Sequence, residues 1–164
     1  MNLVKTFALT VGLLSVTTAH AGQSAIKWQN FKNYEDVQSP YQSDDAYRNY
    51  ITTNFEQHLA KLSKDLPNDF KLIVEITDLD LAGKVRYEGS KKVRLVNDIY
   101  MPEIKLNYTL IDGKGQIVNQ NKDISLKNMS FINDKAGRSR DTMFFYEKRL
   151  MTKWFNKAVL SKVS

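Results

Sequence analysis

The sequence predicts an α+β fold, a single domain in which a mainly antiparallel sheet of about four to five strands carries two helices packed on one face. Three observations lead to this prediction. Apolar residues recur at helical spacing towards both ends of the chain, the segments between them alternate apolar and polar residues, and no linker or internal repeat divides the chain. Helices that bracket a run of strands favour one layer of helices on one sheet.

The first strand and the first helix are expected between residues 26 and 67. Residues 26–31 alternate apolar and polar side chains, which is typical of a strand. Ser43 can then cap the free N–H groups of a helix, and Pro67 ends it. The apolar face of this helix consists of residues spaced three or four apart: Tyr47, Ile51, Phe55, Leu59, Leu62 and Leu66.

Residues 70–81 are expected to form a strand whose pattern changes partway. Up to Thr77 one face is apolar, but Asp78 and Asp80 would then fall on that same face. A regular strand cannot bury both halves correctly, because its side chains alternate with a period of two. A β-bulge near Thr77-Asp78, or an exit from the sheet there, resolves the conflict.

The remaining strands follow in order. A short strand is expected at 93–96, and residues 104–110 alternate most clearly of all. The Asp-Gly-Lys-Gly turn at 112–115 then returns the chain into 117–126 as an antiparallel partner. Because 117–126 is more polar, we expect it nearer an edge of the sheet.

A second helix is expected at the C-terminal end, with Asp141 as its cap. Apolar residues between 144 and 159 follow helical spacing. Beside them, Arg149, Lys153 and Lys157 repeat every four residues and form a basic stripe.

Residues 1–21 have the features of an export signal. A basic residue, Lys5, precedes the short apolar run 7–16, and Ala19-His20-Ala21 is a cleavage site of the small-x-small kind. An uncleaved anchor is the alternative, but a spanning helix needs roughly 20 apolar residues and this run is shorter. We therefore expect cleavage near Ala21-Gly22, a periplasmic or secreted protein, a single α+β domain over 22–164, and no transmembrane segment in the mature chain.

Composition excludes several kinds of chemistry. The chain has no cysteine, and cleavage leaves His58 as the single histidine, so thiol catalysis and the usual zinc sites are excluded. No G-x-S-x-G motif accompanies His58, which argues against a serine hydrolase. We assign no catalytic residues, no cofactor and no metal.

Charge is unevenly distributed along the sequence. Residues 133–164 hold eight basic and three acidic side chains, whereas 22–132 hold equal numbers of each. A basic segment can meet an anionic membrane, a polyanionic sugar or nucleic acid, or it can simply be a solvated helix face flanked by a basic loop. Nucleic acid is not expected as a partner of an exported protein.

Asp78 and Asp80 are the sharpest polar feature, and they support two interpretations. Paired carboxylates at a strand end can hold a hard cation or act as acid and base. A metal-assisted hydrolase would need a further acid beside them, such as Asp98 or Glu103. Alternatively, the two residues are structural and accept backbone N–H bonds in a turn.

Several segments together resemble a known family. These are Leu66-Pro67, residues 72–83 with the specific run 77–83, residues 102–110, the Asp112-Gly113 turn, and residues 146–150 followed by Trp154-Phe155. They are similar to the exported proteobacterial proteins called domain of unknown function 3016, over nearly all of the chain after residue 21. The resemblance implies a Gram-negative periplasmic or secreted protein. It implies no activity and supplies no catalytic residues.

These observations favour a non-enzymatic binding or interaction module of the cell envelope. Asp78, Asp80, Arg149, Lys153 and Lys157 are its candidate binding residues, and an envelope protein or an anionic envelope component is the expected partner. The alternatives are a metal-assisted hydrolase that uses the two aspartates, and membrane-surface binding through the basic C-terminal helix with Trp154 and Phe155 inserted. The sequence indicates no oligomeric state.

Overall fold

The main sheet is built from two units that are distant in sequence. In the first, strand β1 (Gln23–Trp28) leads through helix α1 (Asp44–Leu62) to strand β2 (Lys71–Asp80), which runs parallel to β1. A parallel pair requires such a crossover. In the second, β5 (Glu103–Ile111) and β6 (Ile117–Lys127) form an antiparallel hairpin that pairs with β2. The strand order is β1-β2-β5-β6, so the expected edge position of the last strand is confirmed.

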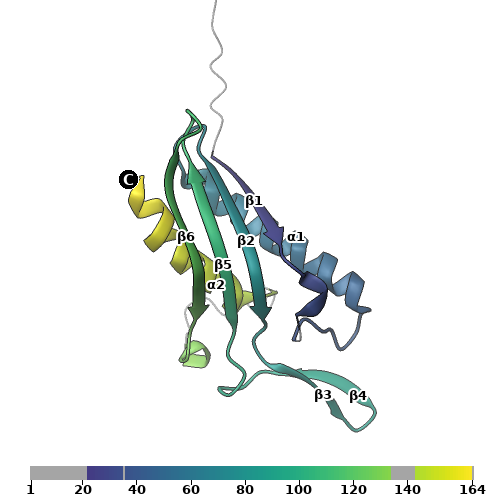
Figure 1. Ribbon diagram of the computed structural model, residues 1–164. Helices are drawn as coiled ribbons and strands as arrows, with labels where there is room; N and C mark the ends of the chain where they lie inside the picture. Colours follow the sequence, from purple (N-terminus) through teal and green to yellow (C-terminus); the bar gives the residue numbers. More distant parts are fainter. Residues whose placement is uncertain (1–21, 35, 134–142, 164) are drawn as a thin grey trace, which may run out of the picture.

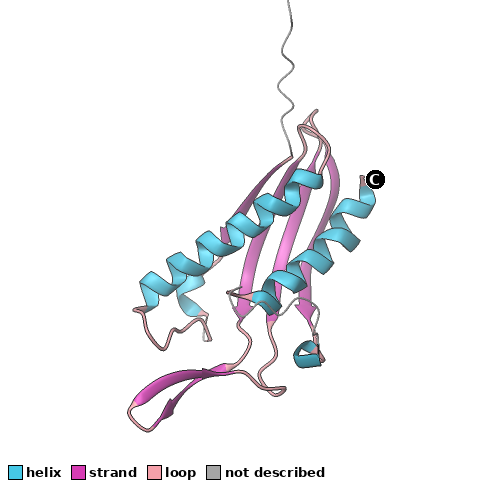
Figure 2. Cartoon of the chain, turned by 180° about the vertical axis from the view of Figure 1, so that it is seen from behind, coloured by secondary structure: helices cyan, strands magenta, loops and turns pink. Residues whose placement is uncertain are grey.

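The computed structural model describes residues 22–34, 36–133 and 143–163. In these residues α1 and α2 (Phe145–Trp154) cover the same face of the sheet (Figure 2), and the other face is open (Figure 1). The expected α+β architecture with both helices on one face is therefore confirmed. The sheet is mixed, because β1 joins it in parallel. Our expectation of 26–31 for the first strand placed it too late. Short 3-10 turns occupy Phe31–Asn33, Ser63–Asp65 and Phe131–Asn133.

Helix α1 follows its sequence pattern closely. The Ser43 side chain accepts a hydrogen bond from the Ala46 N–H at 3.4 Å, as expected of a helix cap. The predicted apolar face supplies four buried residues: Tyr47, Ile51, Phe55 and Leu59. They pack on the sheet together with buried residues of β2 and β5, so one continuous core joins helix and sheet.

The C-terminal helix changes its winding along its length. After α2 the chain forms a π-helical turn, Phe155–Val159, and then a 3-10 turn, Leu160–Lys162. Trp154, Phe155 and Val159 are buried against the sheet. The expected cap, Asp141, lies outside the described residues. No helix in the described part of the chain is long and apolar enough to cross a bilayer.

A second, two-stranded sheet projects from one end of the main sheet (Figure 1). Its strands are β3 (Lys84–Glu88) and β4 (Lys91–Leu95), which pair antiparallel. We call residues 84–95 the arm. The single short strand expected at 93–96 was wrong in extent and missed β3, because neither arm strand has a consistently apolar face.

Candidate functional site

The aspartates that the sequence singled out lie at the end of β2, just beyond a bulge. Pairing with β5 shifts between Ile76 and Asp78, which confirms the expected bulge. The shift turns Leu79 into the core, where it is 1% exposed, and leaves Asp78 at the surface. The bulge therefore keeps both halves of the strand correctly buried.

Tyr34 fixes the loop that faces this bulge. Its hydroxyl donates to the backbone oxygen of Ile76 at 2.8 Å and contacts that of Gln29 at 2.7 Å. Asp36 follows Tyr34 closely and so comes to lie beside Asp80. Asn33, Asp36, Asp78, Leu79 and Asp80 line a cavity of about 330 Å³, which we call the acidic corner.

Asp78 is already engaged at its two carboxylate oxygens. Oδ2 forms an ion pair with Lys105 Nζ at 2.9 Å, and Oδ1 accepts the N–H of Leu79 at 3.0 Å. The second contact is a backbone bond of the kind that a structural role requires. Both side chains of the ion pair are largely exposed to solvent.

Asp80 has the more unusual environment. Burial raises the pKa of its carboxyl to about 6, and the charge and hydrogen bond of Asp36 act in the same direction. The charges of Asp78 and Glu103 add to this effect on the pKa. A proton bound by Asp80 can therefore be shared with the Asp36 carboxyl through the hydrogen bond between them.

The acidic corner does not assemble the metal site that a hydrolase would need. The residues that the structure describes contain no group of three or more His, Cys, Asp or Glu side chains arranged to hold a metal ion. Glu103 lies opposite Asp80 in the ladder but is bonded to Ser125 at 2.7 Å and Lys127 at 2.9 Å. Asp98 does not line the cavity.

Two members of the basic stripe line a groove between β6 and the C-terminal helix. Its volume is about 350 Å³, and we call it the basic groove. Lys153 and Lys157 stand on the helix side and Lys127 on the strand side, whereas Arg149 is not among the lining residues. The remaining lining residues are uncharged: Ser125, Leu126, Asn128, Leu150, Trp154 and Ala158.

Trp154, one of the residues that line the basic groove, carries a hydrogen-bond donor without a partner among the described residues. Its side chain is 6% exposed and packs edge-on against Tyr108, with ring centroids 5.3 Å apart. The indole Nε1 is buried and has no hydrogen-bond partner among the described residues. A buried N–H without an acceptor costs about 1–3 kcal/mol, so a ligand acceptor that reached Nε1 would be favourable.

The π-helical turn borders the same groove. The Ala158 carbonyl accepts hydrogen bonds from Asn119 Nδ2 at 3.0 Å and Tyr108 Oη at 3.3 Å. These bonds tie the C-terminal helix to β5 and β6 beside the groove. Single π turns within helices often accompany functional sites.

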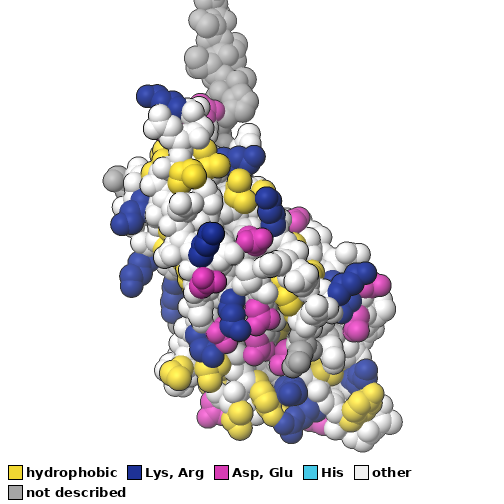
Figure 3. All heavy atoms as spheres, viewed as in Figure 1, with side chains coloured by type: hydrophobic (Ala, Val, Ile, Leu, Met, Phe, Trp, Pro, Cys, Tyr) yellow, Lys and Arg dark blue, Asp and Glu magenta, His cyan; other side chains and the backbone are white. Residues whose placement is uncertain are grey.

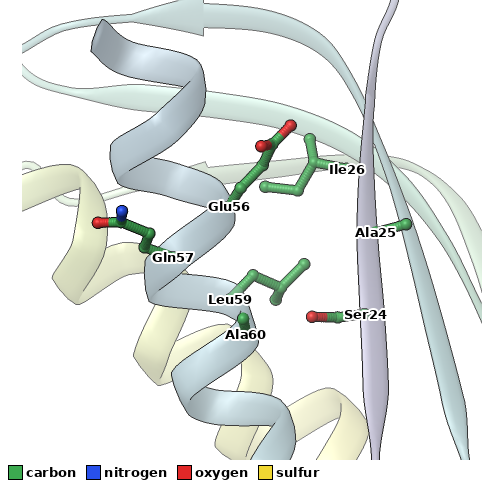
Figure 4. A pocket seen from close by; sticks show the side chains of 7 residues that line it. All are labelled: Ser24, Ala25, Ile26, Glu56, Gln57, Leu59 and Ala60. Carbon is green, nitrogen blue, oxygen red and sulfur yellow. The ribbon is translucent and has the colours of Figure 1, made fainter.

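A second cleft lies at the opposite edge of the sheet, between β1 and α1. Its volume is about 440 Å³. Figure 4 shows Glu56, Leu59 and Ile26 extending into it, while Gln57 points away. Glu56 is its one charged lining residue. This cleft is larger than the basic groove but offers little charge with which to select a ligand.

His58, the one histidine of the described chain, joins the two helices. Its Nε2 lies 3.0 Å from the Lys148 carbonyl and 2.9 Å from Thr152 Oγ1. Burial lowers the pKa of the imidazole, so the neutral form is favoured. These contacts give His58 a structural role.

The sequence analysis missed a buried contact at the base of the arm, between the Glu147 carboxyl and the backbone N–H of Ala82. Glu147 is 3% exposed and accepts the N–H of Ala82 at 2.6 Å. Burial raises the pKa of its carboxyl, while the Arg94 charge opposes that rise. The sequence does contain a sign of this contact, because Glu147 is an acidic residue on the otherwise apolar stripe of the C-terminal helix.

The family comparison agrees with the resemblance drawn from the segments above. A family model described as Protein of unknown function (DUF3016) matches residues 22–157, which is most of the chain. No curated protein and no solved structure matches the chain. The chain belongs to the DUF3016 family of proteins of unknown function.

Proposed function

We propose that this protein is an exported, non-enzymatic module of the Gram-negative envelope that binds an acidic, extended segment of a partner protein in the basic groove. One observation carries the proposal. Among the described residues, the groove is lined by three lysines and by no acidic residue, over an apolar floor, and of the three lysines Lys127 also pairs with Glu103. Such a site favours carboxylates beside aliphatic side chains.

The position of β6 supports an extended ligand. β6 is the last strand of the sheet, and among the described residues no strand pairs with its outer side. Its free backbone groups can hydrogen-bond to an added strand, which is a common way of binding peptides. Lys153 and Lys157 on the helix would then face the acidic side chains of that strand.

A designed peptide tests the proposal directly. The probe is a ten-residue peptide of alternating Glu and Val, and a Lys-Val peptide serves as the opposite-charge control. We expect calorimetry to detect binding of the Glu peptide alone, with an affinity that falls as salt rises. Equal binding of both peptides, or of neither, would contradict the proposal.

Paired variants locate the site. Replacing both Lys153 and Lys157 with glutamine should weaken binding of the Glu peptide at least about tenfold, since close charge pairs contribute more than 1 kcal/mol each when partly desolvated. The matched control replaces Lys91 and Lys92, which lie on the arm, and should leave the affinity unchanged. If both variants lose equal affinity, net charge and not the groove explains binding.

The indole allows a finer test. Trp154→Phe keeps a ring in the groove but removes the N–H. If a carboxylate of the ligand accepts from Nε1, this variant binds the Glu peptide several-fold more weakly at unchanged salt dependence. An unchanged affinity would show that the indole takes no part.

Export has its own test. We expect protein recovered from the periplasm of a Gram-negative host to begin at Gly22, as read by intact mass. A mass that retains residues 1–21 in a membrane fraction would support the anchor instead.

A further inference from the structure

The arm is exposed on all sides, unlike the main sheet. None of the residues in β3 or β4 is buried, and no other helix or strand of the described chain packs extensively against them. A two-stranded hairpin by itself is marginally stable in water. An element built in this way suits a surface that becomes covered when it meets a partner.

The base of the arm is nevertheless held firmly. The Arg94 guanidinium donates to the carbonyls of Gly83 and Gln38 at 2.7 Å, and to that of Asp36 at 3.0 Å. Gly83 has a φ of 80°, and a Cβ there would lie 2.5 Å from the Leu95 oxygen. The arm is therefore presented at a fixed angle and extends away from the sheet (Figure 2).

The arm is strongly basic. Its twelve residues, 84–95, include five Lys or Arg and one acid, Glu88. Lys84, Lys91 and Lys92 are exposed, and Lys92 lies over the Tyr87 ring at 5.5 Å. Averaging over 22–132 hides this second concentration of positive charge.

Apolar side chains are exposed beside these charges. Tyr87 is 71% exposed and Ile99, in the loop that leaves the arm, is 70% exposed. Leu95 and Val96 are about 40% exposed. Figure 3 shows hydrophobic and basic side chains next to one another at this end of the molecule. Cationic side chains around exposed tyrosine and aliphatic groups are typical of protein surfaces that meet lipid headgroups.

We propose that the arm docks within the headgroup layer of an anionic lipid surface, where Lys92, on the same face of the hairpin as Tyr87, and Lys84 and Lys91, on the opposite face, meet the phosphates. Tyr87 and Ile99 lie in the same headgroup layer. Each basic side chain near such a surface adds attraction, and the tyrosine favours the interface. A strand-adding protein fits less well, since Lys and Arg along both exposed strands oppose edge pairing. This inference is independent of the basic groove.

The C-terminal helix is a poorer membrane surface than the arm. Trp154 is 6% exposed and Phe155 is fully buried, so neither can insert into a bilayer while the fold is intact. The apolar residues that line the groove with Lys153 and Lys157 are buried or half-buried: Leu126, Leu150, Trp154 and Ala158. Lipid binding through the helix would be electrostatic alone.

Vesicle flotation tests the proposal on protein purified after export. The vesicles are phosphatidylcholine alone, or phosphatidylcholine with three parts in ten of phosphatidylglycerol. We expect binding to the anionic vesicles alone. The triple variant Lys84→Gln, Lys91→Gln, Lys92→Gln should bind at least about tenfold more weakly. The matched control, Lys61→Gln, Lys64→Gln, Lys114→Gln, replaces exposed lysines outside the arm and the basic groove, has the same net charge and should bind as wild type.

A second variant separates the apolar contribution. The double variant Tyr87→Ser, Ile99→Ser should still bind anionic vesicles at low salt. As salt rises, its affinity should fall several-fold more steeply than that of wild type, because only the attraction between charges then remains. Thermal unfolding checks that each variant is folded. The proposal is overturned if both triple variants lose equal affinity, if both kinds of vesicle bind equally, or if the arm lysines bind the Glu-Val peptide and not vesicles.

Discussion

The main sheet and the arm differ in what fixes their strands. In β2 and β5 one face is buried, with four fully or nearly fully buried residues in each strand. In the arm no residue is buried, and Arg94 and Gly83 set its position. The sheet is therefore stabilised mainly by apolar burial, and the arm by a few polar contacts at its base.

This difference separates stability from function. Substitutions that disturb the sheet should unfold the protein, whereas exposed arm residues can vary without loss of the fold. Apart from Arg94, the arm holds four basic residues and an exposed tyrosine that the fold does not need, which supports the docking role proposed for it.

The largest effect is expected in the core. Phe55 is fully buried and its ring contacts Trp28 and Phe144. Phe55→Ala should lower the free energy of unfolding by about 3–5 kcal/mol, measured by urea denaturation. Tyr87→Ala, at an exposed aromatic of the arm, is the control and should change it by less than about 0.5 kcal/mol. Similar losses in the two variants would refute the comparison.

Arg94 should give the next largest effect. Arg94→Ala removes the hydrogen bonds to carbonyls at the base of the arm and the favourable charge near buried Glu147. We expect the free energy of unfolding to fall by about 2–3 kcal/mol. We also expect the substitution to speed amide exchange, relative to wild type, more in 84–95 than in 103–111. Arg86→Ala, whose partner is the exposed Tyr100 hydroxyl, should leave exchange in the main sheet unchanged. Equal exchange in both segments would mean that Arg94 does not hold the arm.

The same contrast explains what could be predicted from sequence. Strands with a buried face alternate visibly, so β2, its bulge and the β5–β6 hairpin were predictable. α1 was predictable to its cap, Ser43. The arm was not, because strands exposed on both faces have no hydrophobic period.

The candidate sites were predictable only in part. Asp78 and Asp80 stood out as a break in a local pattern, and Lys153 and Lys157 as a helical repeat. Their partners come from distant segments: Asp36 is placed by the Tyr34 contacts, and Lys127 by the pairing of β6. These residues are brought together by tertiary contacts, and no short-range sequence pattern contains that information.

Asp80 should give a smaller, pH-dependent effect. Its folded-state pKa, raised to about 6, exceeds the unfolded value near 3.8, so the folded protein holds the proton more tightly. The contribution of Asp80 to the free energy of unfolding is fully present below about pH 4 and is lost as the pH rises to about 6. Asp80→Asn should therefore gain about 1 kcal/mol over wild type above pH 6, after allowance for solvent screening. A pH-independent difference between the two melting curves would contradict this account.

The smallest effect is expected two residues away, at the ion pair of Asp78 with Lys105. Both side chains are more than 40% exposed, so water competes with their attraction. A double-mutant cycle with Asp78→Asn and Lys105→Met should give a coupling of about 0.2–1 kcal/mol that declines as salt rises. The charges on the exposed face of the main sheet would then resemble the exposed lysines of the arm, which contribute little to folding. A coupling well above 1 kcal/mol that salt does not reduce would instead place Asp78 among the groups that hold the sheet together.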